Sequence, residues 1–203
     1  DGPLSSVEVF DSASGEPLQT MTVPDSAGGL IYDKIITQPP GSLPAALRTK
    51  VTESIDYNFD GFPDLRIVKY WPQPLEERSY HIWLFDTATN QFVYSSSLSA
   101  LPAPVPIASQ RLVSSLALEG MSGAEFTRNY YGFEVDGSLR LDRSIQQTLR
   151  DEFRFVFERS IRERRYGALA PVCRIVVPGE GRARIISGDP TNCSVYLTKQ
   201  RRL

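Results

Sequence analysis

Residues 79–97 read Ser-Tyr-His-Ile-Trp-Leu-Phe-Asp, then Thr-Ala-Thr-Asn, then Gln-Phe-Val-Tyr-Ser-Ser-Ser. Apolar and polar side chains alternate on both sides of a four-residue segment of turn-forming residues, a pattern typical of a β-hairpin. Aromatic and β-branched residues of this kind suit the half-buried surface of a pleated sheet. This stretch therefore favours antiparallel β structure.

The same two-residue period recurs along the chain. Residues 7–10 and 18–23 read as a hairpin around a Ser/Gly/Pro turn. Asp136-Gly137 is a two-residue turn signal, because such turns require positive φ. Together these patterns predict an all-β protein built of antiparallel hairpins, as one β-rich domain over 1–203. Further short alternating runs occupy residues 51–55, 65–70, 111–120, 124–135 and 172–177.

One segment admits two interpretations. Residues 144–165 fit a helix, with Leu149, Phe153 and Phe157 on one stripe. They also fit strand structure, in which Phe153, Phe155 and Phe157 alternate with other residues. The neighbouring strands favour β structure, and a short helix near 144–165 is the alternative.

Composition describes an ordinary globular chain. Its 203 residues are 41% hydrophobic and 23% charged, and no apolar run approaches the ~20 residues that span a bilayer. A net charge of −2 argues against nucleic-acid binding. Because the chain starts at Asp1 without an initiator Met, we expect that a targeting segment has been removed. Membrane tethering through such a removed N-terminal lipid anchor stays open.

Charge is unevenly divided along the chain. Residues 1–139 hold 8 Lys/Arg and 17 Asp/Glu, whereas residues 140–203 hold 14 and 7. A basic surface suits an acidic partner, a phospholipid headgroup or the anionic cell wall. The alternative is that these arginines pair with acidic residues of the same protein. The basic charge of the part 141–203 therefore does not by itself predict a function.

The sequence offers little for catalysis. The single histidine, His81, lies inside an apolar strand, and one histidine cannot build a multi-histidine metal site. The sequence also contains no GxSxG, Walker or GxGxxG motif. We therefore predict that the protein is not an enzyme.

Two cysteines bear on the compartment. Cys173 and Cys193 are separated by 20 positions in a segment of strand and turn character. The favoured interpretation is one disulfide, which fits the periplasm or an extracellular compartment. Two buried thiols are the alternative.

The most specific motif is the acidic segment 56–64, Asp-Tyr-Asn-Phe-Asp-Gly-Phe-Pro-Asp. Oxygen ligands on alternate residues of a tight loop converge on one point, and Ca²⁺ accepts about 6–8 oxygens. Gly61 permits the sharp turn, whereas Ile67 stands where an EF-hand has its bidentate Glu. We predict a β-hairpin calcium loop of the type seen in integrin FG-GAP repeats, with a metal-free Asx-rich turn as the alternative. The predicted ligands are the side chains of Asp56, Asn58, Asp60 and Asp64 and the carbonyl oxygen of Phe62.

Two segments resemble a known family. Residues 55–67, IDYNFDGFPDLRI, and 80–101, YHIWLFDTATNQFVYSSSLSAL, are similar to calcium-binding periplasmic immunity proteins. These neutralise peptidoglycan hydrolases delivered by bacteria-killing type IV secretion systems, and they are similar to periplasmic inhibitors of invertebrate-type lysozyme. The resemblance covers roughly 50–140, including the hairpin 129–141, NYYGFEVDGSLRL. The basic part 141–203 does not align.

The resemblance implies inhibition by an inserted loop. The related lysozyme inhibitors present Ser-Gly followed by an aromatic residue, which enters the hydrolase cleft and engages a catalytic carboxylate. The matching positions here are Ser122, Gly123 and Phe126, with Phe in place of the more usual Tyr. Tyr130 adds a residue type favoured at binding hot spots. An ordinary Ser-Gly turn joining two strands is the alternative.

The resemblance also implies a partner and a place. We expect a cognate peptidoglycan hydrolase as the partner, Ca²⁺ as the cofactor and the periplasm as the compartment. The alternative function is a calcium-dependent extracellular carbohydrate-binding or adhesion module, in which Trp71, Trp83 and tyrosines stack on sugars.

Overall fold

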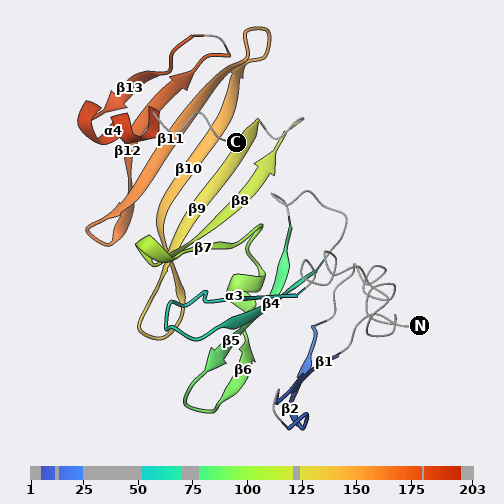
Figure 1. Ribbon diagram of the computed structural model, residues 1–203. Helices are drawn as coiled ribbons and strands as arrows, with labels where there is room; N and C mark the ends of the chain where they lie inside the picture. Colours follow the sequence, from blue (N-terminus) through green and yellow to red (C-terminus); the bar gives the residue numbers. More distant parts are fainter. Residues whose placement is uncertain are drawn as a thin grey trace. The chain divides into compact units, whose positions relative to one another are not determined.

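The computed structural model describes residues 6–11, 14–24, 52–69, 78–120, 124–179 and 181–197 (Figure 1). The chain divides into two compact units, Asp1–Arg111 and Leu112–Leu203, each of which is described by itself. The boundary lies inside the segment 50–140 that carries the family resemblance. Compactness does not decide whether a unit folds alone, so the single domain over 1–203 stays a prediction.

The first unit contains two antiparallel sheets. β1 (Ser6–Phe10) pairs with β2 (Pro17–Thr22), as the first predicted hairpin requires. The second sheet has the order β3-β4-β5-β6. Its strands are β3 (Thr52–Ile55), β4 (Asp64–Val68), β5 (Tyr80–Asp86) and β6 (Gln91–Tyr94). They are followed by α3 (Ser96–Ser99), β7 (Val105–Ile107) and the 3₁₀ helix η2 (Ala108–Gln110).

The two sheets of the first unit share a core. Met21 and Val23 pack with Ile67 and Trp83, all of them buried. Gln19 joins the sheets by hydrogen bonds: its Nε2 donates to the carbonyl of Phe92 and its Oε1 accepts from the Phe92 N–H, both at 2.8 Å. A side-chain amide thus satisfies both backbone groups of a residue in the short strand β6, in the way a neighbouring strand would.

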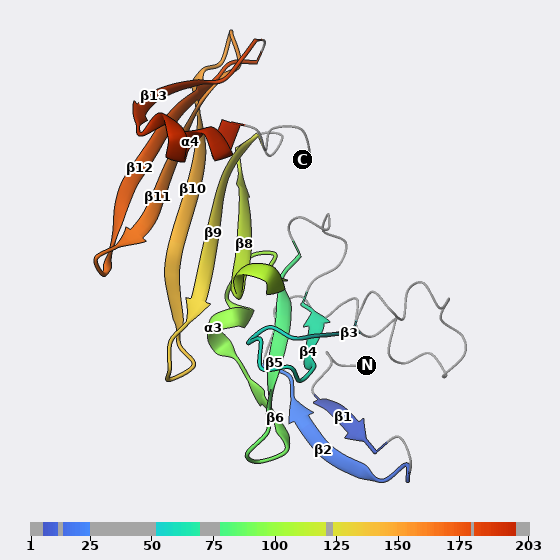
Figure 2. The same ribbon diagram turned by 60° about the vertical axis from the view of Figure 1, so that its left-hand side comes forward.

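The second unit is built on an antiparallel meander. Each strand pairs with its chain neighbour, in the order β13-β12-β11-β10-β9-β8 (Figures 1 and 2). Its strands are β8 (Leu112–Glu119), β9 (Glu125–Phe133), β10 (Leu139–Asp151), β11 (Val156–Arg165), β12 (Ala168–Val177) and β13 (Arg184–Gly188). The chain then forms α4 (Pro190–Leu197). The predicted all-β class, with few helices, is confirmed.

The ambiguous segment 144–165 forms parts of two strands and the turn between them. Its preferred β interpretation is confirmed, and the helix alternative is wrong, because β10 and β11 pair antiparallel from Arg143↔Glu163 to Asp151↔Val156. The sequence pattern did not predict α4. It begins where Asp189 Oδ1 accepts the Thr191 N–H at 2.7 Å, and Pro190 stands at its first position. This Asp-Pro start is a helix signal that the strand pattern obscured.

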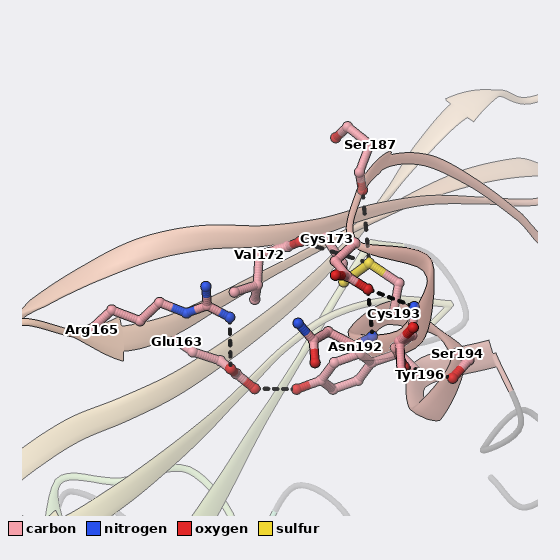
Figure 3. The surroundings of a disulfide bond; sticks show 11 residues. Glu163, Arg165, Val172, Cys173, Ser187, Asn192, Cys193, Ser194 and Tyr196 are labelled. Carbon is pink, nitrogen blue, oxygen red and sulfur yellow. Dashed lines mark hydrogen bonds and ion pairs between the residues drawn. A yellow bond between two sulfur atoms is a disulfide. The ribbon is translucent and has the colours of Figure 1, made fainter.

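The predicted disulfide is present. Cys173 on β12 and Cys193 on α4 are bonded, with their Cα atoms 5.7 Å apart (Figure 3). Both belong to a buried cluster that includes Ile161 and Ile175. The disulfide therefore fixes a short helix on one face of the sheet.

The arginines of the second unit pair with acidic residues of the same unit. Arg140 and Arg164 both contact Asp142, and Arg143 contacts Glu163. Arg150 and Arg174 both contact Glu158, which is 7% exposed. Much of the basic charge of 141–203 is thus used within the sheet.

None of the described helices is long and apolar enough to cross a membrane.

Candidate functional site

The acidic loop connects β3 to β4. Ile55 and Asp64 are opposite each other in the register of this antiparallel pair, and residues 56–63 form the connection. Phe59 and Gly61 have positive φ values of 61° and 93°. The backbone therefore turns sharply twice, and glycine is the residue best suited to the second position.

Asp56 organises the first half of the loop. Its Oδ1 accepts the Phe59 N–H at 2.7 Å, and its Oδ2 accepts the Gly61 N–H at 3.1 Å. Both positive-φ residues are thus held by one carboxylate. This is the Asx-turn chemistry through which Asp side chains stabilise tight loops.

Asn58 and Asp60 organise the second half. Asn58 Oδ1 accepts the Asp60 N–H at 3.2 Å, and Asn58 Nδ2 donates to Asp60 Oδ2 at 2.8 Å. Asp60 Oδ1 accepts the Phe62 N–H at 2.8 Å. The side chains at loop positions 1, 3 and 5 therefore all fold back over the backbone of the same short loop.

Asp64 differs from the other predicted ligands because it is 1% exposed. Its Oδ2 accepts the Tyr57 N–H at 2.7 Å, and its Oδ1 accepts the Phe85 N–H at 2.9 Å. Burial raises the pKa of Asp64, although these two N–H groups act to lower it. This carboxylate ties the start of the loop to β5, a structural role that the sequence did not reveal.

Tyr57 fastens the loop to the body of the unit. Its side chain is fully buried, and its hydroxyl donates to the carbonyl of Pro104 at 3.1 Å. Arg66 Nη1 donates to the same hydroxyl oxygen at 3.0 Å. Burial raises the pKa of Tyr57 to about 12, so the phenol is neutral at physiological pH.

The loop has oxygen atoms of the type that Ca²⁺ prefers. Ionised carboxylates offer about four lone-pair sites each, and the hydrogen bonds above use only part of this capacity. Among the described residues, no group of three or more His, Cys, Asp or Glu side chains stands close enough together to hold an ion. Calcium binding by Asp56, Asn58, Asp60, Phe62 and Asp64 stays a prediction.

The predicted partner-binding residues lie around the β8–β9 connection. Ser122 and Gly123 fall outside the described residues. Phe126 on β9 is 6% exposed, and the guanidinium of Arg159 lies 5.7 Å from its ring centre. A ring in this position packs within the sheet, so its burial disfavours the predicted role as a partner anchor.

Tyr130 is better placed for contact. It is partly buried on β9, and the guanidinium of Arg143 lies 5.0 Å from its ring centre. Arg143 also contacts Glu163, so the ring is supported by a charged pair on β10 and β11. Its role in partner binding stays a prediction.

His81 and Trp83 are interior residues of β5. They are 2% exposed each, and their rings both lie near Tyr94. Burial, with a further effect of the Lys69 charge, lowers the pKa of His81 to about 4. The imidazole is therefore neutral at physiological pH. Trp83 offers no exposed face for a sugar, and Trp71 lies outside the described residues.

Two exposed aromatic residues were not among the binding residues predicted from the sequence. Phe153 and Phe155 lie in the turn between β10 and β11 and are 97% and 63% exposed. The alternation of Phe153, Phe155 and Phe157 suggested a strand, whereas only Phe157 belongs to one. The adjacent polar pair Asp151-Glu152 was the available signal of a turn.

Comparison with known proteins identifies no family. No family model matches the chain, and no curated protein matches it. The chain is similar in structure to a Xanthomonas protein described as related to a type IV secretion system, with 19% identity and a TM-score of 0.46. The match covers 60% of this chain and 57% of that one, less than two thirds of its length. A likeness of this size does not decide what the chain binds.

Proposed function

We propose that this protein is a periplasmic immunity protein that binds and inhibits a secreted peptidoglycan hydrolase. We further propose that Ca²⁺ on the loop 56–64 stabilises its first unit. The observation that carries the proposal is the union of the two segments on which the family resemblance rests. β4 pairs with β5, and the last acidic residue of the loop, Asp64, accepts the N–H of Phe85. The two halves of the sequence motif are thus parts of one hydrogen-bonded structure.

The disulfide supports the proposed compartment. Disulfides form and persist in oxidising environments such as the bacterial periplasm and are rare in the cytosol. The Cys173–Cys193 bond joins a strand to a helix of one unit and leaves no free cysteine among the described residues. A periplasmic partner would meet the protein in this oxidised form.

The residue content and spacing of the loop support the proposed cation. The carboxylates of Asp56 and Asp60 both fold back onto one tight turn, and a cation bound there would offset the repulsion between like charges. Loops of this kind bind Ca²⁺ through side-chain oxygens and one backbone carbonyl, here that of Phe62. The ion would supply charge neutralisation and hold the turn in one conformation. Inhibition itself would be a matter of protein–protein contact.

The experiment is a cell-wall clearing assay. A peptidoglycan hydrolase encoded beside this protein would be assayed alone and with increasing amounts of the protein, in calcium and in EDTA. We expect clearing to stop at a one-to-one ratio, because an inhibitor that binds tightly is titrated stoichiometrically. Undiminished clearing, together with retention of the protein on insoluble peptidoglycan, would replace the immunity proposal with a glycan-binding one.

A pair of variants tests the predicted inhibitory loop. Ser122→Arg adds a long charged side chain at the predicted plug and should weaken inhibition. Thr87→Arg adds the same side chain to an exposed turn of the first unit and is the matched control. Unaltered inhibition by the Ser122 variant would place the contact surface elsewhere on the protein.

A further inference from the structure

The turn between β10 and β11 lies at one end of the second unit's sheet (Figures 1 and 2). Its two aromatic side chains are exposed. The turn comprises Glu152, Phe153, Arg154 and Phe155, followed by Val156, the first residue of β11. Single exposed apolar residues are common, but a cluster of them marks a binding surface more often than chance. This cluster adjoins a hollow of about 760 Å³ that also involves the Pro178-Gly179 segment.

The turn has a tight, hydrogen-bonded backbone geometry. Asp151 Oδ1 accepts the Arg154 N–H at 3.1 Å, and Phe155 adopts a φ of 49°. Bulky residues rarely occupy this left-handed region, and strained residues of this kind cluster at functional sites. A Cβ at Gly179 would lie 3.0 Å from the Cβ of Phe155, so glycine allows the neighbouring segment to approach. Binding by a preformed turn costs less conformational entropy.

Arg154 carries a charge that is available to a partner. Its side chain is 83% exposed, and its contact with Asp151 is long, 3.9 Å. Arg150, which precedes the turn on β10, is instead paired with the nearly buried Glu158. The turn therefore presents one accessible guanidinium between two exposed phenyl rings. Aromatic residues and Arg are the types most enriched in binding hot spots.

We propose that this turn, residues 152–155, enters the substrate cleft of the hydrolase that the protein inhibits. This inference rests on the proposed function. A glycoside hydrolase has a pair of carboxyl groups across its cleft, and its sugar subsites accept flat apolar surfaces. Arg154 pairs with one of these carboxylates, and Phe153 and Phe155 occupy the adjacent sugar subsites. Inhibition by this turn is competitive with the glycan.

A membrane is the less favoured occupant. Phenylalanines at a turn can insert into lipid, but attachment to an anionic surface requires an excess of basic side chains nearby. The turn and its immediate flank contain Arg150 and Arg154 against Asp151 and Glu152, so there is no such excess. The adjacent acidic residues Asp151 and Glu152 would oppose binding to an anionic lipid surface.

The test compares two turns that lie at opposite ends of β11. The first variant combines Phe153→Ala with Phe155→Asn, because Asn tolerates positive φ and preserves the backbone. The control is Tyr166→Asn in the β11–β12 turn, where Tyr166 is 106% exposed and has a φ of 51°. Both variants thus replace an exposed aromatic residue at a left-handed position, Phe155 or Tyr166, by Asn. Arg154→Glu, which reverses the charge at the centre of the proposed contact, is measured in parallel.

Inhibition of the hydrolase that the clearing assay identifies as the partner is titrated with a soluble peptidoglycan fragment as substrate, and thermal melting is recorded for each variant. We expect the double Phe variant and Arg154→Glu to weaken inhibition at least about 30-fold, as loss of a hot spot does. Tyr166→Asn should inhibit as the wild type does, and all melting temperatures should remain close together. Wild-type inhibition should weaken as the fragment concentration rises.

The outcomes separate the two proposals. Full inhibition by both turn variants would overturn the role of this turn and leave the immunity function standing. Failure of the wild-type protein to inhibit would overturn the immunity function and this inference together. Binding of the wild type to vesicles with 30% anionic lipid, lost in the double Phe variant while hydrolase inhibition is retained, would assign the turn to a membrane instead.

Discussion

The two units are both antiparallel β structures, but their interiors are stabilised by different chemistry. In the first unit the buried groups include the Asp64 carboxylate and the His81 imidazole. In the second unit a covalent bond joins β12 to α4, and ion pairs such as Arg174–Glu158 line the sheet. The first unit should therefore respond to cations and pH, and the second to redox conditions.

The largest expected effect is loss of the disulfide. Replacing Cys173 and Cys193 together by Ala should lower the stability of the second unit by about 3 kcal/mol, because the bond closes a loop with a sequence separation of 20. Chemical denaturation, followed separately in each unit by hydrogen exchange, measures the change. We expect the amides of β4 and β5 to be protected as before. An equal loss of protection in both units would contradict the division drawn here.

The second effect concerns calcium. Saturating Ca²⁺ at 100 times its Kd should stabilise the protein by about 2.7 kcal/mol, and EDTA should remove this increment. Asp60→Asn should abolish the calcium response, because Asp60 is a predicted ligand. The amide can keep one of the two hydrogen bonds that the carboxylate accepts, and both are exposed, so the loss without calcium should be small. Calcium titration with a melting readout checks both. The matched control is Asp86→Asn in the β5–β6 hairpin, which lies outside the loop and should retain the response.

Strand positions were the most predictable feature, for a local reason. Alternation placed the hairpin at 79–86 and 91–97, and the structure has β5 over Tyr80–Asp86 and β6 over Gln91–Tyr94. The second strand ends early because Ser95 accepts the Leu98 N–H and begins α3. Serine side chains favour helix starts, but the sequence Ser95-Ser96-Ser97 alone did not show whether the strand continues or a helix begins.

The candidate site was predictable only in its ligand spacing. The tight turn formed by Asp56, Asn58 and Asp60 could be predicted from the sequence, because their hydrogen bonds join residues close together in the chain. The role of Asp64 does not, because one of its partners is Phe85, 21 positions away in the chain. Exposure of Phe153 likewise depends on where β10 ends, and a strand pattern continues through that point. The local alternation of polar and apolar residues carries no information about contacts between distant segments of the chain.

The third effect separates structure from metal binding at one residue. Asp64→Asn should destabilise the first unit by about 2 kcal/mol even in EDTA, because an amide can accept only one of the two N–H groups now satisfied. The amide nitrogen would face a second donor, from Tyr57 or Phe85. Denaturation in EDTA measures the effect, with Asp60→Asn as the comparison. Equal stabilities of the two variants in EDTA would show that Asp64 acts only through calcium.

The smallest effect is the pH dependence of the first unit. Burial lowers the pKa of His81 to about 4, whereas an unfolded histidine titrates near 6.5. Between these values the unfolded chain binds more protons than the folded one, so stability is full above pH 6.5 and falls as the pH falls towards 4. We expect the free energy of unfolding to fall by about 2 kcal/mol between pH 7 and pH 5.

His81→Gln should flatten this pH dependence, because glutamine has no proton to gain over the range. Denaturation curves of the wild type and the variant, each at pH 7 and pH 5 in EDTA, isolate the histidine from the calcium loop. The Cys173→Ala, Cys193→Ala protein serves as the control from the other unit and should keep the acid sensitivity of the first. If the Gln variant loses as much stability at pH 5 as the wild type, acid acts on another group. Asp64 cannot be that group, since burial raises its pKa and protonation then favours the folded state.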